Sequence, residues 1–165
     1  MKFPEAKIIA DETLELLKPH CERIQIAGSV RREKPEVRDI EIVAIAKPYE
    51  NRGFFTNGIA TVVNQWEKVK GELPCKYTQR ILPAGIKLDL FFATPDTWGF
   101  LLAIRTGSAE YSHKILADGW VAKGYHAKKC ILYCGHKIKK FREEKELFEF
   151  LGLGWVEPKD REFGS

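Results

Sequence analysis

Two apolar segments carry acidic residues at positions whose side chains would point to the same face of a β-sheet. The segment DIEIVAIA at residues 39–46 is rich in β-branched residues, which favours a central strand. Asp39 and Glu41 are separated by one residue, so both carboxylates of such a strand point to the same face. Asp89 lies in a second strand-like segment, IKLDLFF at residues 86–92. The chain is therefore expected to form a sheet with one apolar and one acidic face.

Three carboxylates on neighbouring strands would form one acidic patch. Like charges at close range are unfavourable unless cations neutralise them. Carboxylate oxygens with open positions suit Mg²⁺, whose remaining ligands are water and phosphate oxygens. The alternative is that these acids are ordinary surface charges on a half-exposed sheet, and for any single acid this is the simpler explanation.

A Gly-Ser corner precedes the acidic pair by about ten residues. Gly28 and Ser29 follow residues 23–27, which alternate as in a strand, and precede Arg31 and Arg32. A turn of this kind into a helix exposes backbone N–H groups that bind phosphate, and an arginine can pair with the same phosphate. A phosphate cradle beside clustered acids has the parts of phosphoryl transfer with two metal ions.

Periodicity and turn residues indicate an α+β fold in two parts. Residues 1–93 are expected to hold a mixed sheet flanked by helices, and residues 94–165 a smaller mixed α+β unit. A Gly- and Asn-containing loop is expected near residues 49–58. The expected helices cover residues 4–18, 59–69, 108–123 and 143–151, with another after the turn at 94–96. The further strands cover 23–27, 76–82, 130–133 and 137–140, and residues 155–161 are expected to be extended.

Composition excludes several classes of protein. With 44% hydrophobic residues in a chain of 165, a real core is expected rather than disorder. No apolar stretch approaches the roughly 18 residues of a membrane span, and the N-terminus lacks the apolar run of a signal peptide. The four cysteines fit no usual zinc spacing and are expected to be reduced thiols. We therefore expect a soluble, cytoplasmic protein without membrane contact.

The net charge of +4 is mild, but the cations are clustered. No acid occurs in residues 119–142, where Trp120, Tyr125 and Tyr133 are interleaved with basic residues. Such a stretch can follow phosphates and stack on bases, which predicts DNA binding. The alternative for the charges is a solvated surface, and for any single aromatic residue packing in the core is the simpler explanation. The candidate DNA-binding lysines of this stretch are Lys123, Lys128, Lys129, Lys137, Lys139 and Lys140.

Four motifs follow one another along the chain: GSVRREKPEVRDIEI from Gly28, KLDLFF from Lys87, RTGSAEYSHKIL from Arg105 and EEKELFEFLGLGWVEPKDRE from Glu143. The Gly-Ser corner, the acid–apolar–acid triplet and the lone later acid resemble the nucleotidyltransferases of the DNA polymerase beta superfamily. The double arginine, the Thr-Gly-Ser segment and the Glu-Pro-x-x-Arg ending are similar to the family X DNA polymerases. The resemblance does not extend to the amino-terminal lyase and helix–hairpin–helix regions of that family, so a minimal core similar to the small viral and phage-encoded relatives is expected.

The resemblance implies a catalytic palm in residues 1–93 and a nucleotide- and DNA-binding subdomain in residues 94–165. It implies that Asp39 and Glu41 ligate two Mg²⁺ ions, which Mn²⁺ can replace, and that Asp89 ligates the catalytic ion. Lys87 would lie near the primer end. The reaction would move a nucleotide from a dNTP to a DNA primer 3′-hydroxyl with release of pyrophosphate, in gap filling or repair. The implied partners are a nucleoside triphosphate and primer–template or gapped DNA, bound by a monomer.

The resemblance also assigns the nucleotide site. Ser29 and Arg32 would hold the β- and γ-phosphates, and Gly28 would form the turn beneath them. The second half of the site would use the Thr-Gly-Ser segment beside the sugar and a serine at the base edge. The nucleotide-binding residues implied are Gly28, Ser29, Arg32, Thr106, Gly107, Ser108 and Ser112.

Several positions depart from the family pattern. Glu41 stands where family X members mostly have Asp, and Ile104-Arg105 replaces an aromatic pair. Leu116 stands near a position that is often an arginine touching the template strand. These departures leave open a nucleotidyltransferase that needs no template and acts on a nucleic-acid end, a small molecule or a protein. A catalytically silent nucleic-acid-binding module is a third reading, which the intact acidic triad argues against.

Overall fold

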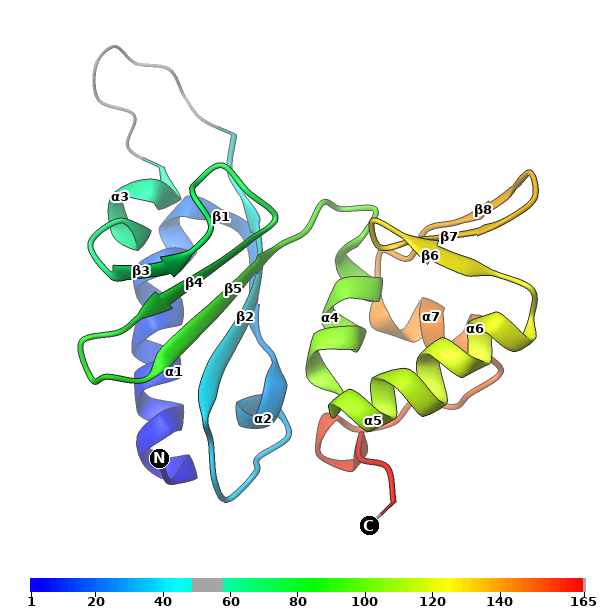
Figure 1. The fold of residues 1–165 in the computed structure, drawn as a ribbon, viewed down its shortest axis with the longest axis horizontal. Coiled ribbons are helices and arrows are strands. Elements are labelled where there is room, and N and C mark those ends of the chain that lie inside the picture. Colours follow the sequence, from blue (N-terminus) through cyan, green and yellow to red (C-terminus); the bar gives the residue numbers. More distant parts are fainter. Residues whose placement is uncertain (49–57, 165) are drawn as a thin grey trace. The chain divides into compact units, whose positions relative to one another are not determined.

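The computed structural model describes residues 1–48 and 58–164, and these form two compact units, Met1–Ala93 and Thr94–Ser165. Figure 1 labels the elements of both units. Most of the loop expected near residues 49–58 lies outside the described residues. None of the described helices is long and apolar enough to cross a membrane. All four cysteines are free thiols.

A mixed five-stranded sheet forms the first unit, with strand order β1-β2-β5-β4-β3. The central strands β2 and β5 run parallel, and every other neighbouring pair is antiparallel. This confirms the α+β fold expected from the sequence. The strands are β1 (Cys21–Ile26), β2 (Asp39–Ala46), β3 (Glu67–Lys70), β4 (Tyr77–Ile81) and β5 (Lys87–Phe92).

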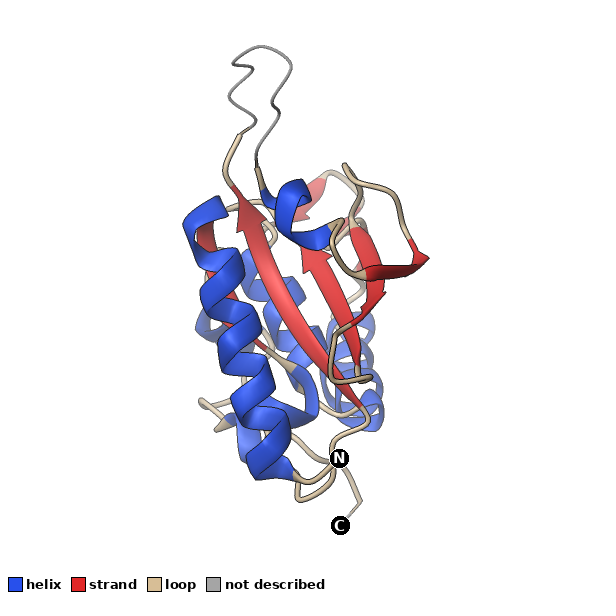
Figure 2. Cartoon of the chain, turned by 90° about the vertical axis from the view of Figure 1, so that its left-hand side faces the viewer, coloured by secondary structure: helices blue, strands red, loops and turns tan. Residues whose placement is uncertain are grey.

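One face of this sheet packs against the long helix α1 (Phe3–Leu17), which lies alongside the strands in Figure 2. Ala6 and Ala10 of the helix are fully buried in the same core as Ile40 and Leu88 of the central strands. Each fully buried Ile or Leu side chain contributes roughly 1.5–3 kcal/mol. Because side chains alternate along a strand, this packing turns the acidic residues of β2 to the opposite face.

The described part of the first unit also contains two shorter α-helices, and a 3-10 turn at Lys18–His20 follows α1. Helix α2 (Gly28–Arg31) is a single turn that contacts β2, and α3 (Ile59–Val63) contacts α1. The prediction of one helix over residues 59–69 was wrong in its second half. After Val63 the chain turns, and residues 67–70 form β3, which pairs with β4.

The second unit packs helices against a small antiparallel sheet of order β6-β7-β8. Its core holds Phe100, Leu116, Trp120, Leu132 and Phe148. The helix expected over residues 108–123 is present but is not uniform, because Ser112–Ala117 has π-helical bonding. The elements are α4 (Trp98–Thr106), α5 (Ala109–Tyr111), α6 (Asp118–Ala122), β6 (His126–Lys128), β7 (Ile131–Cys134), β8 (Lys137–Lys139) and α7 (Glu144–Phe150).

A buried ion pair ties the end of this unit to α7. Arg161 is fully buried and donates to the carboxylate of Glu144, which is also buried. The guanidinium group of Arg161 lies 4.7 Å from the Phe148 ring centre and 4.9 Å from that of Trp155. Its backbone oxygen accepts a hydrogen bond from the amide of Ser108 at 3.0 Å. The tail, expected to be extended and in fact containing a 3-10 turn at Pro158–Asp160, therefore braces the Thr-Gly-Ser segment.

Candidate metal and nucleotide site

The three predicted catalytic carboxylates share one face of the first sheet. Glu41 on β2 and Asp89 on β5 are direct partners in the parallel pairing, and Asp39 is opposite Lys87. Paired residues on adjacent strands point to the same side, with neighbouring strands about 4.8 Å apart. Asp89 is only 8% exposed, and Asp39 and Glu41 are half-buried. The geometry thus brings together all three acids that the sequence singled out, with Lys87 exposed beside them.

The electrostatics of this face reflect its crowding. Burial raises the pKa of Asp39, and the negative charge of Asp89 raises it further. Lys87 and Arg38 act in the opposite direction, but the net pKa shift remains upward. Burial is the larger cause of this shift and repulsion by Asp89 adds to it, and a divalent cation bound beside the two carboxylates would relieve that repulsion.

The Gly-Ser corner lies against the acidic pair. Gly28 begins α2 with a φ of +59°, and a Cβ at this position would lie 1.9 Å from Oε2 of Glu41. The amide of Ala27 donates to the backbone oxygen of Glu41 at 2.8 Å, which fixes this approach. The side-chain oxygen of Ser29 is buried and has no hydrogen-bond partner among the described residues. Arg32 ends the turn and is half-buried. The corner that touches Glu41 through Gly28 therefore also carries a buried hydroxyl without a hydrogen-bond partner among the described residues.

Within the described residues, no three acidic, cysteine or histidine side chains close around a common point as a finished metal cage. The donor chemistry nevertheless fits Mg²⁺, since the three neighbouring groups are all carboxylates. Magnesium sites usually keep several waters and take further ligands from substrate phosphates. Because substrate phosphates supply the remaining ligands of such a magnesium site, the open arrangement of these three carboxylates is compatible with Mg²⁺ binding.

Two residues that the sequence analysis missed support Asp89. The hydroxyl of Tyr77 and the amide Nε2 of Gln79, the latter at 2.8 Å, both donate to Oδ1 of Asp89. Gln79 is directly opposite Asp89 in the β4–β5 hairpin. The signal was present in the sequence, because the short connection between the expected strands at 76–82 and 86–92 fixes which of their residues face one another.

In the second unit, the Thr-Gly-Ser segment forms a tight turn between α4 and α5. Thr106 is fully buried, so in this conformation its side chain shapes the turn and does not reach a ligand. The hydroxyl of Ser108 accepts from the amide of Tyr111 at 3.0 Å, and that of Ser112 donates to the oxygen of Ile104 at 2.8 Å. A Cβ on Gly107 would lie 2.8 Å from the Tyr111 ring. The side chains of this segment therefore mainly hold its own backbone.

The six candidate DNA-binding lysines are all exposed, but they do not share one surface. Lys139 pairs with the buried Leu132 and points to the core side of the small sheet, whereas Lys128 points to the other side with Ile131. Lys123 and Lys139 lie 5.7 and 5.9 Å from the Phe150 ring centre. Lys140 lies 3.5 Å from a carboxylate oxygen of Asp96. Lys137 is on the core side with Lys139, and Lys129 is in the β6–β7 turn.

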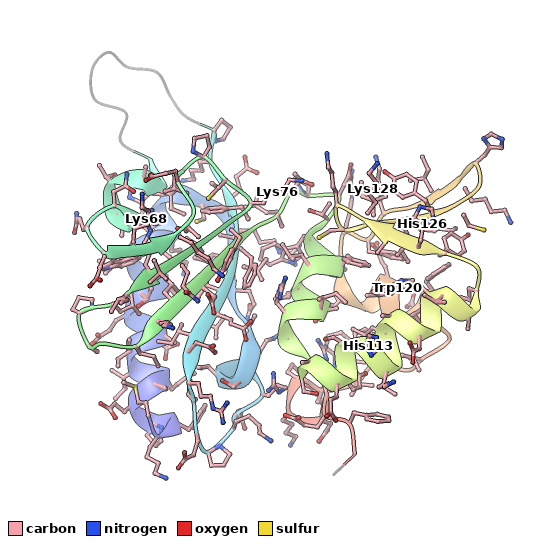
Figure 3. All side chains as sticks on the ribbon, in the orientation of Figure 1. Lys68, Lys76, His113, Trp120, His126 and Lys128 are labelled. Carbon is pink, nitrogen blue, oxygen red and sulfur yellow. The ribbon has the colours of Figure 1, made fainter. Side chains whose placement is uncertain are left out.

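The aromatic residues of this stretch also differ in exposure. Trp120, labelled on α6 in Figure 3, is 6% exposed and packs against Phe100 with ring centres 5.1 Å apart. For Trp120 the simpler of the two explanations, packing in the core, is the correct one, and the ring is not available to stack on bases. Tyr125 contacts Phe150 edge-on, and Tyr133 stacks on His126 on the outer side of the sheet.

A comparison with protein families connects the second unit to DNA polymerases. Residues 101–162 match the model of the DNA polymerase beta thumb family. The match includes the Thr-Gly-Ser segment, the lysine-rich sheet and the Glu144–Arg161 pair, and it supports DNA binding by a DNA polymerase beta-like protein. A search of curated proteins found no match to the chain.

Proposed function

We propose that this chain is a metal-dependent nucleotidyltransferase that adds a nucleotide from a dNTP to the 3′-hydroxyl of a DNA primer and releases pyrophosphate. The observation that carries the proposal is the parallel pairing of β2 and β5, which gathers Asp39, Glu41 and Asp89 beside the Gly28 corner. The thumb match of residues 101–162 supports a polymerase of the DNA polymerase beta type. The proposed form is a minimal family X-like core, acting as a monomer on gapped or primer–template DNA.

The acidic face would organise the reacting groups. Asp39 and Glu41 would hold both metal ions, and Asp89 would hold the catalytic one and help to take the hydroxyl proton. When bound, Mg²⁺ or Mn²⁺ lowers the pKa of the attacking hydroxyl and neutralises phosphate charge. The 3′-oxygen then bonds to the α-phosphorus, the bond from that phosphorus to the bridging oxygen breaks, and pyrophosphate leaves.

The corner and the second unit would bind the substrates. The buried hydroxyl of Ser29 would turn outward and, with the neighbouring backbone amides and Arg32, would hold the β- and γ-phosphates of the nucleotide. Gly107 would offer its backbone to the sugar. The exposed lysines around β6–β8 would follow DNA phosphates, and Lys87 would lie near the primer end.

Primer extension tests the proposal directly. A gapped duplex is incubated with dNTPs and Mg²⁺ or Mn²⁺, and incorporation is compared with that of the Asp39→Ala variant. The wild-type chain is expected to extend the primer, and the variant should lose extension. Absence of incorporation by folded wild-type protein under both metals would refute a polymerase function.

A second function is favoured by one observation. Leu116, near a position where relatives often have an arginine that touches the template, is fully buried in the core and cannot contact a template strand. A transferase that extends a nucleic-acid end without a template, or modifies a small molecule or protein, is therefore the alternative. Each nucleotide supplied singly with a single-stranded primer distinguishes the two, since a templated enzyme should add only the complementary nucleotide.

A further inference from the structure

We propose that Tyr77 and Gln79 are positioning residues, which hold one oxygen of Asp89 so that the other oxygen is available to a divalent cation. This inference rests on the proposed function and assigns the β4 strand a part in it. Asp39, Glu41 and the corner all come from β1, β2 and α2, whereas these two donors lie on the other side of Asp89 in the sheet.

The two hydrogen bonds converge on a single atom. Tyr77 Oη and Gln79 Nε2 both donate to Oδ1 of Asp89. Among the described residues, Oδ2 of Asp89 accepts no hydrogen bond. A carboxylate bound in this way has one oxygen satisfied by neutral donors and one that keeps its lone pairs. Asp89 is therefore prepared to ligate a cation through one oxygen rather than two.

The donors themselves are held firmly. The ring of Tyr77 stacks on Phe91 with centres 4.8 Å apart, and the ammonium group of Lys70 lies 5.2 Å from the Tyr77 ring centre. Lys70 also pairs with Gln79 across β3 and β4. Both side chains thus project from an internal strand whose neighbours restrict their movement, and such a frame orients a ligand more accurately than a loop does.

The orientation matters because Asp89 is 8% exposed and shares its face of the sheet with Asp39 and Glu41, whose negative charges repel its carboxylate. Without its two donors, the Asp89 carboxylate could turn away from the other acids and reduce this repulsion. The hydrogen bonds oppose that rotation and keep the third carboxylate in line with the first two. We thus expect the two residues to affect the cation that Asp89 holds and the chemical step, and to leave nucleotide affinity largely unchanged.

The test uses Tyr77→Phe, which keeps the stacked ring, and Gln79→Met, which keeps the length of the side chain. Gln65→Met is the matched control, since Gln65 is exposed in the turn after α3. Primer extension gives kcat and the KM for dNTP, and electron paramagnetic resonance of Mn²⁺ titrated into the full chain without DNA gives metal affinity. Each site variant is expected to lower kcat about tenfold. It should also lower the affinity for the more weakly bound of the two Mn²⁺ ions about tenfold, while the KM for dNTP changes less than about twofold.

The same variants in an Asp89→Asn background separate positioning from a general structural role. If Tyr77 acts through Asp89, Tyr77→Phe should cause no further loss of Mn²⁺ affinity in that background. The inference would be overturned if Tyr77→Phe lowered Mn²⁺ affinity equally in the Asp89→Asn background. It would also be overturned if both single variants kept kcat and Mn²⁺ affinity within about twofold of wild type. If the wild-type chain extends no primer, the proposed function fails, and the Mn²⁺ titrations still decide whether Tyr77 and Gln79 orient Asp89.

Discussion

Gly28 leaves no room for a side chain beside Glu41. In Gly28→Ala, the new Cβ would overlap the Glu41 carboxylate and the residue would keep a φ of +59°. The left-handed backbone alone costs about 1–2 kcal/mol for a residue with a Cβ. We expect this loss of unfolding free energy together with loss of primer extension, because Glu41 must move. Urea denaturation and an extension assay measure the two effects.

Gly135→Ala is the control for backbone strain. Gly135 has nearly the same φ, +57°, and a Cβ there would have nothing within 4 Å. It should lose similar stability and keep its extension activity. Equal activities of the two variants would contradict the close contact between the corner and Glu41.

Asp39 should make stability depend on pH. Its pKa is raised in the folded chain by burial and by Asp89, so the folded state binds this proton more tightly than the unfolded state. The contribution of protonated Asp39 to the free energy of unfolding is therefore fully present below the unfolded pKa near 4, and it is lost as pH rises through the folded pKa. In Asp39→Asn, we expect a higher urea midpoint than wild type at pH 7 in EDTA, and a smaller difference at pH 3.5.

Added Mg²⁺ provides a check on this interpretation. It should raise the midpoint of the wild-type chain, since a ligand of the folded state stabilises it, and should raise that of Asp39→Asn less. If Asp39→Asn is less stable than wild type at pH 7 in EDTA, the ionised carboxylate of Asp39 does not destabilise the folded chain.

At this scale, the sequence predicted the acids well and their surroundings poorly. The alternation of β2 was enough to place Asp39 and Glu41 on one face, and the strand prediction around Asp89 was enough to suggest a neighbour. Tyr77 and Gln79 were missed because their role depends on which residues face one another across two strands. The sequence left two explanations open for Trp120, because an aromatic residue near lysines has the same local pattern whether it is buried or exposed.

Among the elements, those with strong periodicity were predicted and those defined by distant pairing were not. The bounds of β2 agree with the segment 39–46. Strand β3 has four exposed residues and is specified by its pairing with β4, so residues 67–70 were assigned to a helix. Strand β6 has three exposed residues and no apolar alternation, so nothing in its own sequence indicated a strand.

The buried Glu144–Arg161 pair should be necessary for the second unit. Arg161→Met leaves the Glu144 carboxylate, 5% exposed, without its ion-pair partner, and removing one member of such a pair typically costs about 3–5 kcal/mol. Urea denaturation should show a loss of this size. The double variant Glu144→Leu/Arg161→Met should recover a large part of it, because no charge remains buried. A double variant as unstable as Arg161→Met would contradict this explanation.

For the molecule as a whole, the small net charge conceals a local concentration of lysines on two sides of one sheet. The ammonium groups of Lys123 and Lys139 lie 5.7 and 5.9 Å from the Phe150 ring centre, so both lysines belong to the surface around this ring. We expect Lys123→Gln/Lys139→Gln to lower DNA affinity and to reduce the slope of log affinity against log salt by nearly 2, about 0.9 for each phosphate contact. Fluorescence anisotropy over a range of salt concentrations measures the slope.

The pair Lys128→Gln/Lys129→Gln changes net charge by the same amount and serves as the comparison. Lys128 is on the outer side of the sheet. A smaller change of slope is expected for this variant. If both double variants reduce the slope equally, DNA contacts both sides of the sheet or responds only to total charge.

The parallel register of β2 and β5 also bears on how the chain folds. Strands β4 and β5 are joined by a short turn, and β1 and β2 pair antiparallel across α2, but Asp39 and Asp89 meet only when these two local pairs dock. The site for divalent ions should thus form only late in folding, after the β1–β2 and β4–β5 pairs have docked. Stopped-flow measurements should find that Mg²⁺ slows unfolding and barely alters the refolding rate, as expected for contacts absent from the transition state. Accelerated refolding would instead place the docking of β2 and β5 early, with the ions acting as a nucleus.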